Sequence, residues 1–259
     1  MFVAYFNSLL TNPRILCRIQ SELGRRPDQK TAVERFIVVT ENYEGLSAAV
    51  YDHLLEEILS SRLKPGEKIP ETRIASEFGC SRAPIRDAMK RLSNNGIIDI
   101  YPRRFAQVAN YSESFIHQIG TARIFNDLAA IKLAVLHGNN LSFYHMKDLN
   151  EECFAARSEN NVALGIKKDC EFHLELSRIS QNELIYKFAK ELYMRIEFIQ
   201  AVKYDDMLTP AEQHKEHDQL VDSLLARDEE SASRLLTLHY SRFHCLYHDY
   251  PENFFHLSV

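Results

Sequence analysis

Hydrophobic positions between residues 46 and 79 recur with the spacing of short helices and are separated by turn residues. In residues 46–61, Val50, Leu54 and Ile58 lie four positions apart, which predicts an amphipathic helix. The Pro-Gly pair of the segment LKPGEKIP then indicates a turn. A short helix follows over RIASEF and is expected to end at Gly79.

A second short helix is predicted directly after this turn. Ser81 is a residue type favoured at helix N-caps, and Gly96 is a natural helix stop. Pro84 falls in the first turn, where its missing N–H does little harm. The next segment, IIDIYPRRFAQVAN, is typical of two short strands joined by a basic turn. Two helices, a tight turn and a two-stranded wing together predict a winged helix-turn-helix.

Beyond residue 111 the hydrophobic pattern is helical almost everywhere. The sequence TPAE at Thr209–Glu212 predicts a capping box with proline at the first helical position. We therefore expect a mainly α protein, in which the small winged helix-turn-helix domain precedes an antiparallel bundle of six or seven helices. The predicted segments are roughly 113–136, 142–157, 161–180, 183–203, 210–226 and 228–248.

The pattern also predicts how the chain divides. Residues 1–42 carry no strong periodicity and are taken as an N-terminal extension of unknown role. The expected order after that extension is a winged helix-turn-helix domain at 43–110, a helical domain at 111–250, and a tail at 251–259.

Composition limits the classes of protein to which the chain can belong. Hydrophobic residues make up 45% and charged residues 26%, an ordinary globular mixture. No stretch approaches the roughly 20 apolar residues of a membrane-spanning helix, and the apolar opening MFVAYFNSLL has no basic segment before it. The five cysteines are scattered and form no CxxC pair, which fits a reducing compartment. We expect a cytoplasmic protein without a membrane partner.

Charge is distributed unevenly along the chain. Residues 80–104 hold six basic and two acidic side chains, a net of +4, whereas residues 111–259 hold 15 basic and 23 acidic side chains, a net of −8. A basic strip on an otherwise acidic protein allows one face to approach phosphate. Charge alone is equally compatible with a solvated helix face.

The second helix of the winged motif carries the candidate DNA contacts. Ser81, Arg82 and Arg86 lie near its N-terminus, where unpaired N–H groups and a partial positive charge suit a phosphate. Arg82 and Arg86 are one turn apart and project from one face. Because the planar fork of arginine matches the major-groove edge of guanine, these two side chains are candidates for reading bases.

The segment LKPGEKIPETRIASEFGCSRAPIRDAMKRLSNNGII resembles the N-terminal domain of the GntR family of bacterial regulators. The resemblance implies that Arg82 and Arg86 read double-stranded operator DNA, and that Ser81 and Pro84 line the contact surface.

Two departures from the family pattern concern the same surface. Thr72 stands where the family usually has arginine, and Phe105 stands where the wing commonly has glycine. The neighbouring Arg73 and the wing residues Arg103 and Arg104 complete the expected DNA-binding set.

Four residues of the second domain form a candidate metal-ligand set. Asp169 and His173 lie four positions apart on one predicted helix, and His217 and His239 each fall on the apolar face of a later helix. Three imidazoles and one carboxylate directed inward suit a divalent ion such as zinc, nickel or manganese. A single histidine on an apolar face is more often a core residue bonded to a neighbour, and that alternative stays open for each of them.

A second resemblance groups these residues together. DCEFHLEL and KEHDQLVDSLLARDEESASRLLTLH are similar to the FCD sensor domain of the FadR-type GntR subfamily, which implies that the four residues are the ligands. The same resemblance matches ARIFNDLAA to the first sensor helix, so that Arg123 would face the pocket and bind a carboxylate. Arg195 is a further pocket arginine or a solvated surface residue.

These observations together predict a transcription regulator and not an enzyme. We expect a homodimer on an inverted-repeat operator, with DNA binding controlled by a small organic acid at the metal-containing pocket. One alternative is a sensor of the metal itself, or a domain whose metal is purely structural. Another is a metal-dependent hydrolase with Glu171 or Glu216 as the base.

Overall fold

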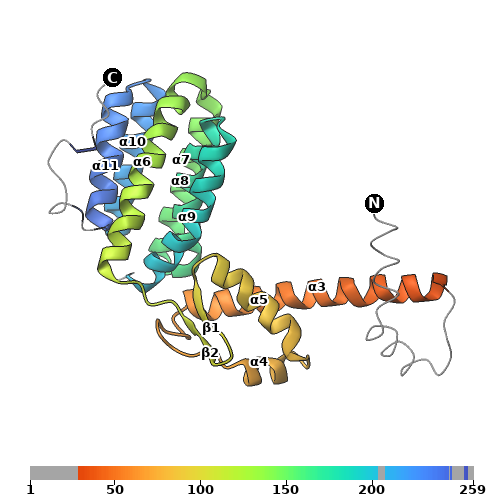
Figure 1. Ribbon diagram of the computed structural model, residues 1–259. Coiled ribbons are helices and arrows are strands. Elements are labelled where there is room, and N and C mark those ends of the chain that lie inside the picture. The colour runs from red at the N-terminus through yellow and green to blue at the C-terminus, as the bar shows by residue number, and fades with distance from the viewer. Residues whose placement is uncertain (1–28, 204–207, 245, 247–253, 256–259) are drawn as a thin grey trace. The chain divides into compact units, whose positions relative to one another are not determined.

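The computed structural model describes residues 29–203, 208–244, 246 and 254–255, with side chains from residue 43 onward (Figure 1). The chain divides into two compact units, residues 1–49 and residues 50–259. Helix α3 (Gln29–Leu59) runs through the boundary between them, and the second unit contains the elements that follow. The predicted helix at 46–61 is therefore the second half of a longer helix. The remainder of the predicted extension, residues 1–28, lies outside the described residues.

The winged motif consists of two short helices and a two-stranded antiparallel sheet. In the sheet, Ile98 is paired with Val108 and Tyr101 with Phe105. Gly79 and Gly96 have φ angles of +56° and +79°, the left-handed region that glycine adopts without strain, and this explains why the helices end there. The elements are α4 (Glu71–Glu77), α5 (Arg82–Asn94), β1 (Ile98–Tyr101) and β2 (Phe105–Val108).

The fourfold spacing in α3 faces the core of this motif. Val50, Leu54 and Ile58 are all buried, and they belong to one hydrophobic cluster with Ile85 and Leu92 of α5. The apolar stripe that the sequence displays is thus the packing face of the helix. Ser81 is the N-cap of α5 as expected, although its side chain makes no capping hydrogen bond.

Six long helices make up the rest of the described second unit. Their limits agree closely with the predicted segments, except that the last helix ends at Phe243 and not near 248. Residue 245 and residues 247–253 lie outside the described part of the chain. The helices are α6 (Glu113–His137), α7 (Asn140–Ser158), α8 (Val162–Ile179), α9 (Glu183–Val202), α10 (Pro210–Leu225) and α11 (Glu229–Phe243).

Polar caps define where these helices begin. An asparagine side chain accepts a hydrogen bond from a backbone N–H of the first turn in α7, α8 and α9. The residues are Asn139, Asn161 and Asn182. Fewer N–H groups at these helix starts are therefore left without a hydrogen-bond partner. The capping box predicted at Thr209 and Glu212 is present, with both reciprocal hydrogen bonds. Short loops between well-capped helices favour antiparallel neighbours.

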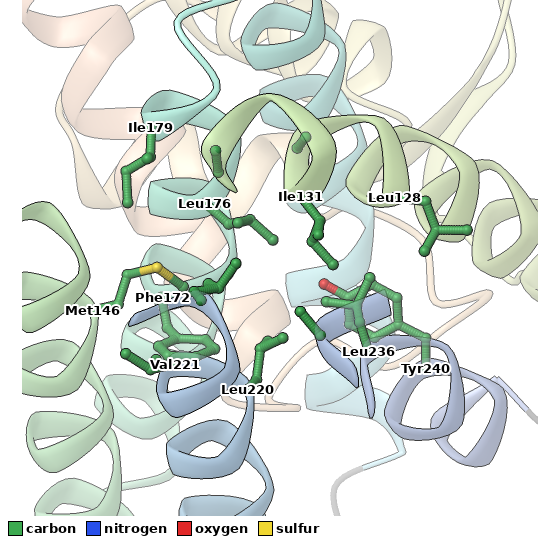
Figure 2. Packing of buried hydrophobic residues seen from close by; sticks show 14 of the residues in the cluster. Leu128, Ile131, Met146, Phe172, Leu176, Ile179, Leu220, Val221, Leu236 and Tyr240 are labelled. Carbon is green, nitrogen blue, oxygen red and sulfur yellow. The ribbon is translucent and has the colours of Figure 1, made fainter. Parts of the chain in front are cut away.

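The core of the bundle lies between these helices, as Figure 2 shows for part of it. Phe172 and Leu176 of α8 are fully buried in the same cluster as Leu220 of α10 and Leu236 of α11. Because these three helices contribute side chains from residues distant in sequence, this core fixes the relative placement of α8, α10 and α11. Those three helices carry the candidate metal ligands.

The mainly α fold with a small two-stranded wing is confirmed. Within the described residues, no helix combines the length and the apolar character that crossing a bilayer requires. Of the five cysteines, Cys80, Cys153 and Cys170 are free thiols, and the other two lie outside the described residues.

Candidate metal centre and DNA-binding surface

Helix α5 has one face packed against the hydrophobic core and an opposite face that carries charged side chains. Ile85, Ala88 and Leu92 are buried, whereas Arg82 and Arg86 are exposed on the side away from them. The hydrophobic face anchors the helix, so the two guanidinium groups are presented one turn apart near its N-terminus. This arrangement suits contact with the major groove.

Carboxylates and hydroxyls of α4 and α3 contact the arginines of this surface. Arg82 donates to the Thr72 hydroxyl over 3.4 Å, and Arg86 lies 3.6 Å from a Glu71 carboxylate oxygen. The exposed Arg86 ion pair contributes only about 0–1 kcal/mol, and the Arg82 hydrogen bond to the hydroxyl is long, so DNA can compete for both side chains. Arg73 is held more firmly, since it donates to the buried Glu57 carboxylate over 2.6 Å.

The structure places the remaining expected DNA contacts in two different environments. Pro84 is buried among the core residues of α5, so its side chain does not line the exposed surface that the resemblance implied. Arg103 and Arg104 are exposed at the wing tip, where Arg103 has a φ of +61°. Phe105 packs against Tyr101, with ring centroids 4.8 Å apart, and so fills the place of the usual glycine with an aromatic pair.

The four candidate metal ligands meet inside the bundle. Asp169 and His173 come from α8, His217 from α10 and His239 from α11, and one ligand atom of each lies within 4.8 Å of the others. The Asp169 Oδ1 atom is 3.7 Å from His173 Nε2 and 3.5 Å from His217 Nε2. Three helices distant in sequence therefore bring together a nitrogen-rich set with one carboxylate.

Each of the three imidazoles uses its Nδ1 atom in a hydrogen bond to a neighbouring side chain. His217 Nδ1 lies 3.0 Å from the Asn150 amide oxygen, and His239 Nδ1 lies 2.7 Å from a Glu216 carboxylate oxygen. Both partners can only accept, which fixes the proton on Nδ1 and leaves the lone pair on Nε2. His173 Nδ1 lies 2.9 Å from the Tyr240 hydroxyl.

The opposite ring nitrogens show whether a metal would fit. His173 Nε2 and His217 Nε2 are buried and have no hydrogen-bond partner. A buried acceptor left without a partner costs about 1–3 kcal/mol, so two of them beside a carboxylate indicate a site made for a cation. Metal-binding histidines commonly donate their other ring N–H to an oxygen, as these do. The residues present fit a divalent ion.

The electrostatics of the site keep the lone pairs available. Burial, reinforced by the positive charge of Arg123 for His173, lowers the pKa of His173 and of His217 well below 6.5. Both imidazoles are therefore neutral at pH 7, the form that binds a metal. Phe172 stacks on His217 with ring centroids 4.1 Å apart and holds the ring in this orientation.

Two glutamine amides contact the carboxylate of the set. Gln200 of α9 donates to Asp169 Oδ2, and Gln213 of α10 donates to Asp169 Oδ1. Gln213 in turn accepts a hydrogen bond from Arg157, whose other nitrogen donates to the Leu208 carbonyl over 2.7 Å. These amides orient Asp169 and occupy lone pairs that the carboxylate can share with an ion.

A small cavity of about 50 Å³ adjoins the ligand set. Arg123 on its wall is fully buried, with Nη2 lacking a hydrogen-bond partner and its guanidinium carbon 3.6 Å from the centroid of the Tyr240 ring. A buried cation with a donor facing a cavity is suited to bind an anion. The cavity is lined by Arg123, Asp169, Gln200, Leu208, Gln213, His239, Arg242 and Phe243.

Other candidates from the sequence lie elsewhere. Arg195 donates to the Glu191 carbonyl over 3.0 Å and does not line this cavity. Glu171 forms ion pairs with Lys167 and Lys168. Glu216 is bound to His239 and Arg242, so it supports a ligand and does not stand free as a base.

Comparison with protein-family models gives two matches along the chain. Residues 46–108 match the family described as bacterial regulatory proteins, gntR family, and residues 119–242 match the FCD domain. The two matches cover the winged motif and most of the helical bundle.

Curated relatives and solved structures agree with these matches. The Nta operon transcriptional regulator of Aminobacter aminovorans is 27% identical over 70% of this chain and 84% of its own length. The transcriptional repressor RspR of Escherichia coli is 22% identical over 76% of this chain and 86% of its own. Among solved structures, E. coli McbR/YncC is similar with a TM-score of 0.64 and 22% identity, covering 80% of this chain and 99% of that one.

Proposed function

Because the chain belongs to the GntR family of bacterial transcription regulators and carries an FCD domain, we propose that a small organic acid at a divalent-metal site controls its binding to operator DNA. The domains and the named relatives are those of transcriptional regulators, not of enzymes. The proposal adds the metal, the acid and the residues that bind them.

The observation that carries the proposal is the pair of buried, partnerless Nε2 atoms of His173 and His217 beside Asp169. His239 completes the set from a partly exposed position at the cavity wall. Nitrogen ligands with one carboxylate suit zinc, nickel or manganese. When bound, the ion supplies positive charge and a coordination position that an acid can share.

The charge balance of the cavity favours an anionic effector. A divalent ion with one carboxylate ligand leaves about one positive charge in a low-dielectric site. Arg123 lies beside it on the cavity wall, and its charge is partly balanced by the buried Asp127 carboxylate. The sequence from residue 111 onward has a net negative charge. An anion is therefore attracted by this local site and not by the domain as a whole. Hydroxy, keto and sugar acids fit this chemistry better than neutral sugars or amines.

The DNA-binding part of the proposal rests on α5 and the wing. We propose that Arg82 and Arg86 read base edges, while Ser81, Arg73, Arg103 and Arg104 approach the backbone. A homodimer in the cytoplasm would place two such surfaces on an inverted repeat and double the contacts. The acid then acts by favouring one arrangement of the paired surfaces.

A purely structural or metal-sensing site is the second candidate. A structural site is normally closed by its protein ligands. Here His239 is 13% exposed at its side chain and lines a cavity with two arginines, which favours an open position for a ligand.

Metal content tests the proposal directly. Protein purified without added metal, then loaded with zinc, nickel or manganese, is expected to bind close to one ion per chain by elemental analysis. His217→Ala and His239→Ala should each reduce occupancy sharply, because each removes a ligand nitrogen. The matched control is His145→Ala, which changes an exposed histidine outside the set. A wild-type protein that resists loading, or a control that loses metal as the ligand variants do, would contradict it.

A further inference from the structure

One buried carboxylate lies behind both halves of the proposed site. Asp127 of α6 is fully buried, and its Oδ2 atom is 2.7 Å from the hydroxyl of Tyr193 and 2.7 Å from the hydroxyl of Tyr240. Its other oxygen accepts from Asn126 over 3.0 Å and from Ser177 over 3.4 Å. The carboxylate is therefore saturated with donors and makes no contact with the cavity of its own.

The two phenols extend this contact in different directions. Tyr240 lies 2.9 Å from Nδ1 of the metal-ligand candidate His173, and Tyr193 accepts a 3.1 Å hydrogen bond from Nε of Arg123. The two phenol oxygens also lie 2.9 Å from each other. With the single proton of each phenol directed to Asp127, each oxygen is left available as an acceptor. His173 Nδ1–H therefore donates to Tyr240, which directs the Nε2 lone pair toward the ligand set.

We propose that Asp127 is a shared positioning residue, which orients His173 for the metal through Tyr240 and Arg123 for the anion through Tyr193. This inference rests on the proposed function and concerns how the metal-binding and anion-binding groups are held. Tyr240 is thus a positioning residue for the metal and Tyr193 for the anion.

The orientations of His173 and Arg123 both depend on the Asp127 side chain. These three residues and the two tyrosines are buried, so water does not replace a lost hydrogen bond. Each group left unsatisfied then costs about 1–3 kcal/mol. Arg123 also lies over the faces of both tyrosine rings, at 3.6 Å from the centroid of Tyr240 and 4.9 Å from that of Tyr193. Replacing either tyrosine by phenylalanine keeps this aromatic contact and removes only the hydroxyl.

The two phenylalanine variants are therefore matched controls for each other. In full-length protein, Zn²⁺ affinity is measured by competition with a chelator, and the visible spectrum of the Co²⁺-loaded protein reports ligand geometry. Tyr240→Phe should weaken Zn²⁺ binding by about 10–100-fold and change the cobalt spectrum. Tyr193→Phe takes one donor from the same carboxylate, keeps the ring that stacks on His173, and removes no hydrogen bond to a ligand. Its Zn²⁺ affinity should stay within about threefold of wild type.

Anion binding is expected to show the reverse pattern. The probe is acetate, with acetamide as its neutral counterpart, and the readout is the rise in Tm of protein saturated with Zn²⁺. Tyr193→Phe should lose the acetate-specific rise, whereas Tyr240→Phe should keep it once the metal is saturating. Asp127→Asn should impair both measurements, because it changes the anchor of both hydroxyls.

Several outcomes would overturn the inference. Equal loss of Zn²⁺ affinity in both phenylalanine variants would mean that the hydroxyls only stabilise the core. An unchanged Zn²⁺ affinity and cobalt spectrum in Tyr240→Phe would contradict the positioning of His173 through Tyr240. An acetate response retained in Tyr193→Phe would contradict the positioning of Arg123 through Tyr193. A wild-type chain that binds no Zn²⁺ would overturn the proposed function as well, and circular dichroism of the metal-free variants identifies any that fail to fold.

Discussion

At the scale of single residues, the buried histidines combine a low proton affinity with a fixed orientation. Burial is the main cause of the lowered pKa of His173, His217 and His244. A histidine that stays neutral in the folded state has no proton to lose when a metal arrives. The same property links folding of the metal-free protein to pH.

We expect the metal-free protein to lose stability as the pH falls below about 6.5. In the unfolded chain His217 has its ordinary pKa near 6.5, whereas the folded value is well below that. Between these two values the unfolded chain binds a proton that the folded chain does not, so the free energy of unfolding decreases as pH decreases, by at most about 1.4 kcal/mol per pH unit for each such group. Above pH 6.5 this histidine contributes no pH dependence.

Urea denaturation at pH 7.5, 6.5 and 5.5 in the presence of a chelator measures this effect. Partly buried acids with a raised pKa, such as Glu197, act in the opposite direction at low pH. The difference in slope between wild type and His217→Gln isolates the histidine. Equal slopes for the two proteins would contradict a neutral, buried His217.

Arg82 and Arg86 allow a second prediction at this scale. Replacing either by Ala should weaken specific DNA binding by about 1–3 kcal/mol if each contacts a base through both nitrogens, without loss of folding. Arg73→Ala should cost less, because its guanidinium already binds Glu57. Binding to a DNA duplex selected from a random pool, measured by fluorescence anisotropy, gives the three affinities. Normal affinity and selectivity in both Arg82 and Arg86 variants would remove these residues from the reading surface.

The sequence indicated which residues form the candidate ligand set, but not which side chains orient them. Asp169 and His173 are one turn apart on one helix, so their shared face follows from helical spacing alone. Asn150 and His217 are 67 positions apart, and Asp127 and Tyr240 are 113 apart. Such pairs depend on how helices pack, and no local pattern indicates them. The pairing of Arg73 with Glu57 and the burial of Pro84 were missed for the same reason.

At the scale of elements, close packing between α6 and α11 depends on a glycine. A Cβ atom added at Gly120 would lie 2.6 Å from both Cβ and Cγ of His244, the C-cap residue of α11. Real atoms do not approach so closely, and neither atom is at the flexible end of its side chain. Gly120 therefore permits the contact between these two helices.

Gly120→Ala is expected to destabilise the protein by about 1–3 kcal/mol, because overlap outweighs the roughly 1 kcal/mol gained in helix propensity. Gly45→Ala is the matched control, since an added Cβ there meets no atom within 4 Å. The control should be neutral or stabilising. Chemical denaturation compares the two, and a Gly120→Ala protein as stable as wild type would contradict the packing described here.

Element limits were largely predictable because local chemistry determines them. The capping box at Thr209 and the glycines at the ends of α4 and α5 are signals within a few residues of the boundary. The start of α3 was not predicted, because the first half of that helix lacks an apolar stripe in sequence.

At the scale of the whole molecule, DNA binding and effector sensing are assigned to different parts of the chain. The segment 80–104 has a net charge of +4 and the segment 111–259 a net charge of −8. This asymmetry favours phosphate binding at the winged motif, and it leaves the proposed anion binding in the bundle to the buried site around Arg123. Control of DNA binding by an acid therefore requires that events at the buried site change the affinity of the exposed one.

The central claim is that an acid bound at the metal site changes DNA binding, and one titration tests it most directly. The affinity of metal-loaded protein for its selected duplex is measured at increasing concentrations of hydroxy, keto and sugar acids, with their neutral analogues as controls. The account predicts that at least one acid shifts the affinity about 5–150-fold in wild type, the range usual for coupled sites, and that Asp169→Ala abolishes the shift. An affinity that no acid changes, or a shift of equal size in Asp169→Ala, would contradict it.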